Sequence, residues 1–166
     1  MGEILEHFRV KQNGFSEFNL LDLDAQTLGK LKLMRALQLS GSISIANSVY
    51  RIESISLWSS RFEIKSEESK LGEIKFNWKG EAIIEFKDYP ELVFKHFSLW
   101  DSSFKLMDKN GQLVCFFKPK IIWSSMNYEI EIAHHPWVLP FEEKELIFLI
   151  LTFVYAYQSQ MSSNVG

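Results

Sequence analysis

The sequence predicts a mainly β protein, namely a closed antiparallel barrel of roughly twelve strands that encloses one hydrophobic C-terminal helix. Three observations lead to this fold class. Apolar and polar residues alternate along most of the chain, a hairpin pattern recurs, and a fully apolar run stands near the end. Strict alternation places one face of each strand in a core and the other in water, as in antiparallel sheets. A sheet of this size must split into a sandwich or close on itself.

The same strand, turn and strand pattern occurs three times. Phe62 corresponds to Phe104 at a spacing of 42 residues, and a fainter earlier copy begins at Phe18. Polar turns separate the paired runs. Residues 108–111 are the clearest turn, since Asn and Gly accept the backbone angles that tight turns require. A propeller also contains repeats of this length, but it generally needs at least about four blades, and only three copies are present.

Further strands are expected between the copies, around residues 4–10, 55–58 and 92–97. The segment 28–46 allows two interpretations, because its apolar residues fit either an alternating strand or one side of a helix. Strand is favoured, since Gly29 and Gly41 bracket the segment and the second copy of the pattern is strand-like at the corresponding position.

The run 146–157 is apolar on all sides, so protein or lipid must enclose it. Its twelve residues would span roughly 18 Å as a helix, well short of the ~30 Å hydrocarbon core of a bilayer. Glutamates precede it, where carboxylates suit the positive end of a helix dipole. We therefore expect a central helix over residues 140–160 and no transmembrane span. A C-terminal membrane anchor is the alternative.

Composition indicates one globular domain over residues 1–166, with the barrel strands in residues 1–135. The apolar share of 46% is sufficient for a core. A net charge of -3 argues against a general nucleic-acid binder, which gains affinity by neutralising phosphates. Cys115 is the only cysteine, so no internal disulfide can form, and the first ten residues lack the apolar core of a signal peptide. A cytoplasmic location is expected.

The paired runs lead to a family resemblance. One hairpin reads Phe62-x-Ile64 followed by Leu71-Gly72-x-Ile74. Such hairpins, followed by a hydrophobic C-terminal helix, resemble the tubby-like barrel superfamily, which includes tubby C-terminal domains, LURP-one-related proteins and phospholipid scramblases. The resemblance extends over nearly the whole chain and implies a barrel threaded by the terminal helix.

The resemblance also implies a partner, either an anionic phospholipid or a protein. Tubby domains bind phosphoinositides, and scramblases are associated with lipid movement. No position here corresponds to the headgroup-binding residues of tubby domains. Scramblases carry an acidic calcium-binding segment before the terminal helix, whereas residues 127–141 contain Glu129 and Glu131 but no Asp.

No P-loop, dinucleotide fingerprint, zinc-protease helix or nucleophile elbow occurs in the sequence. We therefore predict no catalytic residue, no cofactor, no metal ligand and no enzymatic activity. Lys118, Lys120 and Trp123 form a small basic and aromatic edge suited to an anionic headgroup at the barrel rim. The alternative is an enzyme whose site assembles from scattered residues, namely Glu129, Glu131, His134 and His135.

Overall fold

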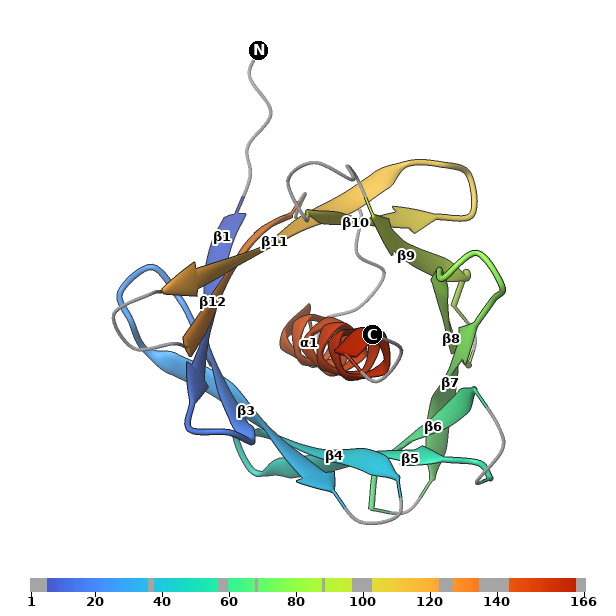
Figure 1. Cartoon of the computed structure of the whole chain (residues 1–166), viewed down its shortest axis with the longest axis horizontal. Coiled ribbons are helices and arrows are strands. Elements are labelled where there is room, and N and C mark those ends of the chain that lie inside the picture. The colour runs from blue at the N-terminus through green and yellow to red at the C-terminus, as the bar shows by residue number, and fades with distance from the viewer. Residues whose placement is uncertain are drawn as a thin grey trace.

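The computed structural model describes residues 6–35, 38–56, 60–67, 69–87, 89–96, 103–122, 127–134 and 144–163. The strands are β1 (Glu6–Asn13), β2 (Glu17–Leu21), β3 (Thr27–Arg35), β4 (Leu39–Ile45), β5 (Ser48–Ser54), β6 (Arg61–Lys65), β7 (Lys70–Phe76), β8 (Ala82–Phe86), β9 (Leu92–His96), β10 (Phe104–Asp108), β11 (Leu113–Ile122) and β12 (Asn127–His134), and the helix is α1 (Lys144–Ser163). Each strand pairs with the next, and β1 pairs antiparallel with β12, which closes the barrel (Figure 1). The predicted fold class is confirmed.

The segment 28–46 forms strands, as favoured from the sequence, and contributes most of β3 and the whole of β4. The prediction of a strand around residues 55–58 is wrong for the two of these residues that the structure describes. β5 ends at Ser54, and Ile55 and Ser56 form a bend. Residues 57 and 58 lie outside the described residues. The barrel keeps twelve strands because β4 supplies the one that was misplaced.

The three copies of the hairpin pattern share a local irregularity. The register shifts by a β-bulge directly after Leu20, Ile64 and Leu106, which are corresponding positions of the pattern. A bulge increases the local twist that a closing sheet needs. The first and third turns are also built alike, since the Oδ1 atoms of Asp22 and Asp108 each accept two backbone N–H groups at 2.8–2.9 Å.

α1 fills the centre of the barrel (Figure 1). Residues 146–154 are all buried, including Thr152, whose hydroxyl donates to the backbone oxygen of Phe148 at 2.9 Å. Aromatic contacts join the helix to separate strands of the wall. Phe148 lies 5.2 Å from Phe8 of β1, and Tyr155 lies 5.7 Å from Phe104 of β10, measured between ring centroids. A barrel this wide needs such an internal element, since its own side chains cannot meet across the middle.

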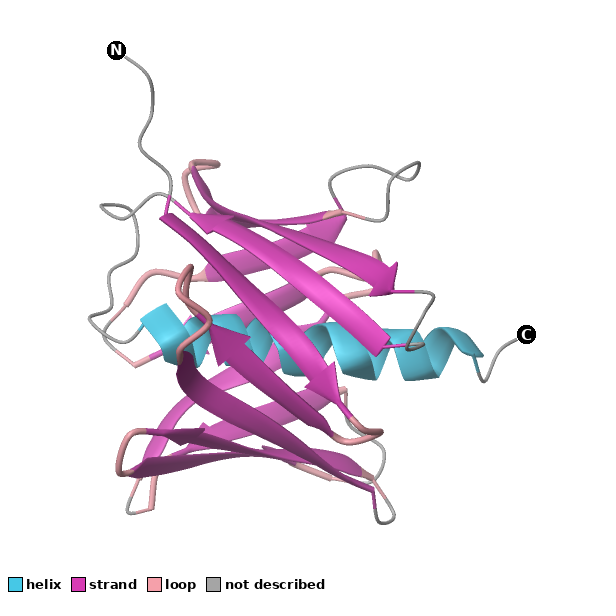
Figure 2. Cartoon of the chain, turned by 90° about the vertical axis from the view of Figure 1, so that its left-hand side faces the viewer, coloured by secondary structure: helices cyan, strands magenta, loops and turns pink. Residues whose placement is uncertain are grey.

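The helix also defines the two ends of the barrel (Figure 2). At the proximal end, where α1 begins, Lys144 Nζ lies 2.7 Å from a carboxylate oxygen of Glu6 at the start of β1. At the distal end, Gln158 Nε2 donates to the backbone oxygen of Gly80, in the turn between β7 and β8. Turns after odd-numbered strands therefore lie at the distal end, and turns after even-numbered strands at the proximal end.

In the part of the chain that the structure describes, no helix is both long enough and apolar enough to cross a membrane. This result agrees with the absence of a transmembrane helix expected from the sequence.

Candidate functional site

The rim predicted from the sequence lies partly on β11, where Lys118 and Lys120 are exposed on the outer face. Trp123 lies outside the described residues. The strand register places Lys118 opposite Glu131 and Lys120 opposite Glu129 on β12. The two lysines of the predicted rim therefore face carboxylates on the neighbouring strand.

Ion pairs engage both of these carboxylates. Lys120 Nζ lies 2.7 Å from Glu131 Oε1, and a guanidinium nitrogen of Arg9 on β1 lies 3.3 Å from Glu129 Oε1. The alternative catalytic group also contained His134 and His135, and neither histidine side chain is among the described ones. At this rim the structure brings lysines and glutamates together, which leaves only a small local excess of positive charge.

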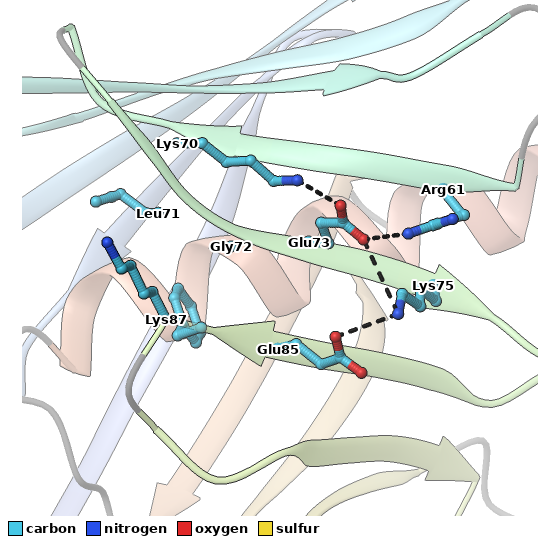
Figure 3. A pocket seen from close by; sticks show the side chains of 9 residues that line it. Arg61, Lys70, Leu71, Gly72, Glu73, Lys75, Glu85 and Lys87 are labelled. Carbon is cyan, nitrogen blue, oxygen red and sulfur yellow. Dashed lines mark hydrogen bonds and ion pairs between the residues drawn. The ribbon is translucent and has the colours of Figure 1, made fainter.

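A more concentrated group of charges surrounds a hollow on the outer face of β6, β7 and β8 (Figure 3). The hollow has a volume of about 470 Å³. Its lining consists of Arg61, Lys70, Leu71, Gly72, Glu73, Lys75, Glu85, Phe86 and Lys87. Four of these side chains are cations and two are carboxylates, so the lining carries a net charge of +2. The whole chain carries -3, so this hollow is locally opposite in sign.

The register explains why the charges collect there. One glutamate from each of four neighbouring strands stands directly opposite the next, and these residues are Glu53, Glu63, Glu73 and Glu85. Like charges in directly opposed positions destabilise a sheet. Cations occupy the adjacent cross-strand rows on both sides, with Lys65 and Lys70 in one row and Arg61 and Lys75 in the other. We call the four aligned glutamates the glutamate row. The cations on both sides of it offset the repulsion between the glutamates.

Glu73 is the centre of this arrangement. Its Oε2 lies 2.6 Å from a guanidinium nitrogen of Arg61 and 4.0 Å from Lys75 Nζ. Its other oxygen accepts a hydrogen bond from Lys70. Hydrogen bonds from Lys70 and Arg61 lower the pKa of the Glu73 carboxyl from 4.5 to about 2. Glu73 is therefore ionised throughout the physiological range, and its charge gathers three cations around one side chain.

The neighbouring lysines link the glutamates into a network. Lys75 Nζ lies 3.2 Å from Glu85 Oε2. On the other side of the row, Lys65 Nζ lies 3.3 Å from carboxylate oxygens of both Glu53 and Glu63. The hydrogen bonds to these two glutamates raise the pKa of the Lys65 ammonium group. The network brings these long side chains together at an exposed surface, where each ion pair contributes at most about 1 kcal/mol.

Lys87 differs from the other cations of the hollow. It is exposed, and it forms no ion pair with any residue that the structure describes. In Figure 3 its side chain lies apart from the glutamates, close to Leu71. Gly72 lies between Leu71 and Glu73 on β7. There β7 and β8 approach so closely that a Cβ atom on Gly72 would lie 2.2 Å from the backbone oxygen of Glu85. The hollow thus has one ammonium group without an ion pair to any described residue, beside a tightly closed pair of strands.

This arrangement suits the binding of an anion. One guanidinium and three ammonium groups supply donors for phosphate or carboxylate oxygens, and Arg61 can form paired bonds to either. Among the described residues of its lining there is no histidine, cysteine or hydroxyl side chain that could act as a nucleophile. No group of three metal-ligating side chains occurs among the described residues. The single cysteine, Cys115, is buried, and this burial raises its pKa to about 12.

No protein-family model matches the chain, and no match was found among curated proteins or solved structures. The fold itself therefore defines the class of protein, a twelve-stranded antiparallel barrel closed around a C-terminal helix.

The sequence did not indicate the hollow, because its residues come from three strands and look like the solvent-facing half of ordinary alternation. One signal was present. Glu63 and Glu73 have cations nearby in the sequence, such as Arg61 and Lys75 two residues away. Only the register shows that these short patterns align into rows of equal charge.

Proposed function

We propose that the protein is a non-enzymatic binding barrel whose hollow on β6, β7 and β8 binds a phosphate-bearing headgroup of an anionic lipid. The observation that carries the proposal is the excess of cations around the hollow, at +2, in a chain of charge -3. Such an excess attracts polyanions and steers their approach even when the protein as a whole is acidic.

The contacts of Glu73 support the proposal. Arg61 and Lys75 both approach its Oε2, at 2.6 and 4.0 Å. A phosphate oxygen requires the same convergence of cations as this carboxylate oxygen. Glu73 therefore acts as an internal competitor for an anionic ligand, and it keeps the cations arranged when no ligand is bound. Lys87 adds an ammonium group that no described glutamate occupies.

A lipid headgroup is favoured over other phosphates by two considerations. The hollow is open on the outer wall of the barrel, so a headgroup on a surface can reach it without entering the core (Figure 3). The resemblance of the sequence to the tubby-like superfamily also favours an anionic phospholipid. The earlier rim at Lys118 and Lys120 is less suited, since Glu129 and Glu131 oppose it directly.

The test is co-sedimentation with phosphatidylcholine vesicles that contain or lack phosphatidylserine. The double variant R61A/K75A removes two cations of the hollow, and K30A/K32A removes two exposed cations of β3 as a matched control. We expect R61A/K75A to weaken binding to the anionic vesicles at least about tenfold, because each basic residue near such a surface contributes about 1 kcal/mol. K30A/K32A should have a clearly smaller effect.

The variant E73Q is expected to change vesicle binding in the opposite direction. It removes the internal competitor and leaves Arg61, Lys70 and Lys75 in place, so it should strengthen binding to anionic vesicles. A purely structural role of the network would predict no gain. Equal losses for R61A/K75A and K30A/K32A, or no gain with E73Q, would contradict the proposed site. Inorganic phosphate or a soluble inositol phosphate that binds with equal affinity would show that the headgroup need not belong to a lipid.

A further inference from the structure

The distal end of the barrel exposes large aromatic side chains at hairpin tips. Phe15, in the turn between β1 and β2, is 92% exposed, and Trp78, in the turn between β7 and β8, is 91% exposed. Met34 and Ile55 are also exposed and belong to the same end. Exposing a large aromatic ring to water is unfavourable, and burying it against an apolar partner would be favourable.

The two aromatic tips stand on opposite sides of the barrel. Their hairpins are separated by half of the strands in either direction around the closed sheet. Figure 1 shows β1 on one side of α1 and β7 and β8 on the other. Between the tips, the C-terminal part of α1 emerges from the barrel (Figure 2). A partner that contacts both rings at once must therefore be broad and flat over the width of the barrel.

Charges are also distributed unevenly between the ends. Among the described residues in turns and at the ends of strands and the helix, the distal end carries the cations Arg35, Arg61 and Lys79 and the carboxylates Glu17 and Glu81. The same parts of the proximal end carry six carboxylates and five lysines. Lys79 Nζ lies 5.5 Å from the ring centre of Trp78, so a cation accompanies the most exposed indole. The distal end therefore suits an anionic surface and the proximal end opposes one.

The geometry points to the distal end as a membrane-docking surface, with Phe15 and Trp78 inserted into the headgroup and acyl boundary of a bilayer. Aromatic side chains favour this boundary because one part of the ring is apolar and its edge tolerates water. Arg35 and Lys79 lie at the same end and would pair with anionic headgroups. A bilayer is the partner that is flat over the required width and combines apolar and anionic chemistry.

This inference rests on the proposed function, because it takes the source of the anionic headgroup to be a bilayer. It adds the orientation of the barrel. β6 begins with Arg61 at the distal end, and Lys75 is the penultimate residue of β7 at that end. With the distal end on the membrane, the part of the hollow formed by these two cations faces the headgroup layer. Lys70 and Lys87 then lie farther from the bilayer.

The experiment measures vesicle binding of F15S, W78S and L23S. Leu23 is the matched control, since it is 75% exposed at a hairpin tip of the proximal end, between Asp22 and Asp24. We expect F15S and W78S each to weaken binding about tenfold, because a buried aromatic ring contributes on this order. The loss should occur with neutral and with anionic vesicles, whereas L23S should bind like the unaltered chain.

The outcomes separate this inference from the proposed function. If F15S and W78S bind normally while R61A/K75A does not, the docking surface is wrong and the headgroup site stands. If the aromatic variants lose binding and R61A/K75A does not, the docking surface stands and the headgroup site is wrong. A homodimer in sedimentation experiments that F15S dissociates, without any vesicle binding, would assign the distal end to a second copy of the chain.

A depth measurement provides a second readout. Lipids brominated on their acyl chains quench a tryptophan only when it enters the bilayer. Vesicle-bound protein should therefore lose quenching when Trp78 is replaced by Phe, which keeps an aromatic ring at the tip. Unchanged quenching in W78F would contradict insertion of this side chain, because the remaining tryptophans would then account for the whole signal.

Discussion

Phe153 of α1 lies edge-on against Phe62 of β6, with ring centroids 5.3 Å apart and ring planes at 76°. One turn later, Tyr157 makes the same contact with Phe62 at 5.0 Å. Edge-to-face pairs contribute about 0.5–1.5 kcal/mol beyond the burial of their area. The helix is thus attached to the same strand that contributes Arg61 to the charged hollow, so the interior of the barrel supports the outer site.

The first prediction concerns this contact. F153A is expected to lower the free energy of unfolding by about 3–5 kcal/mol, since it removes a large ring and leaves a cavity between the helix and a closed wall. Phe153 is 0% exposed. Urea denaturation followed by circular dichroism measures the change. F15A deletes the same ring at an exposed site and should stay within about 0.5 kcal/mol of the unaltered chain.

The second prediction compares two glycines that face the interior. G72A would place a Cβ atom 2.2 Å from the backbone oxygen of Glu85, so β7 and β8 must separate. In G41A the nearest atoms belong to the side chains of Phe153 and Leu31, at 3.0 and 3.1 Å, which can shift. We expect a loss of about 3 kcal/mol or more for G72A and about 1 kcal/mol for G41A. Equal urea midpoints for the two variants would contradict this interpretation.

Much of the fold could be predicted because the inner face of a barrel leaves a regular trace in the sequence. Phe62, Ile64 and Ile74 alternate with polar residues, and each is buried as that pattern requires. The run 146–157 was correctly assigned to the core for residues 146–154 and 156, whereas Tyr155 and Tyr157 are partly buried. The misplaced strand at residues 55–58 shows the limit. Apolar residues in a bend can have the same short alternation as a strand.

The candidate site could not be predicted in the same way. Lys118 and Lys120 are close in sequence and attract attention as a basic edge, but β12 places Glu129 and Glu131 against them. Arg61 and Lys87 are far apart in sequence and line the same hollow only because β6, β7 and β8 are paired in one register. Outer-face charges contribute little to the choice of register, which the buried face determines. Their alignment therefore follows from the core and is not visible in any short segment.

The third prediction concerns the pH dependence of stability. The folded-state pKa of Glu73, about 2, lies below the ordinary value of 4.5. Its ion pairs therefore stabilise the fold fully above the ordinary value, and this contribution is lost as the pH falls from 4.5 toward 2. E73Q should be less stable by about 1 kcal/mol at neutral pH, as for a favourable surface network. The difference in urea midpoint should shrink on acidification over that range. A difference that stays constant would contradict the assigned ion pairs.

The fourth prediction concerns Cys115, which is 0% exposed and whose pKa is raised to about 12 by burial. The thiolate is the reactive form of cysteine, so both the protonation of this thiol and its inaccessibility protect it. We expect no labelling by a thiol reagent in the native protein and complete labelling in urea. Labelling of the native protein at the rate of a small free thiol would show that the wall near β11 opens readily.

The fifth prediction tests the role of α1 as the filling of the barrel. A chain that ends at Phe141 lacks the whole helix, and the inward side chains of the wall then surround a space that water would enter. The barrel has no second element to close this space in its described part, so we expect an insoluble or unfolded product. A chain that ends at Ser159 keeps every helix residue described as buried and should remain folded. Solubility and the far-ultraviolet circular dichroism spectrum distinguish the two products. A folded and soluble chain ending at Phe141 would contradict the dependence of the wall on its central helix.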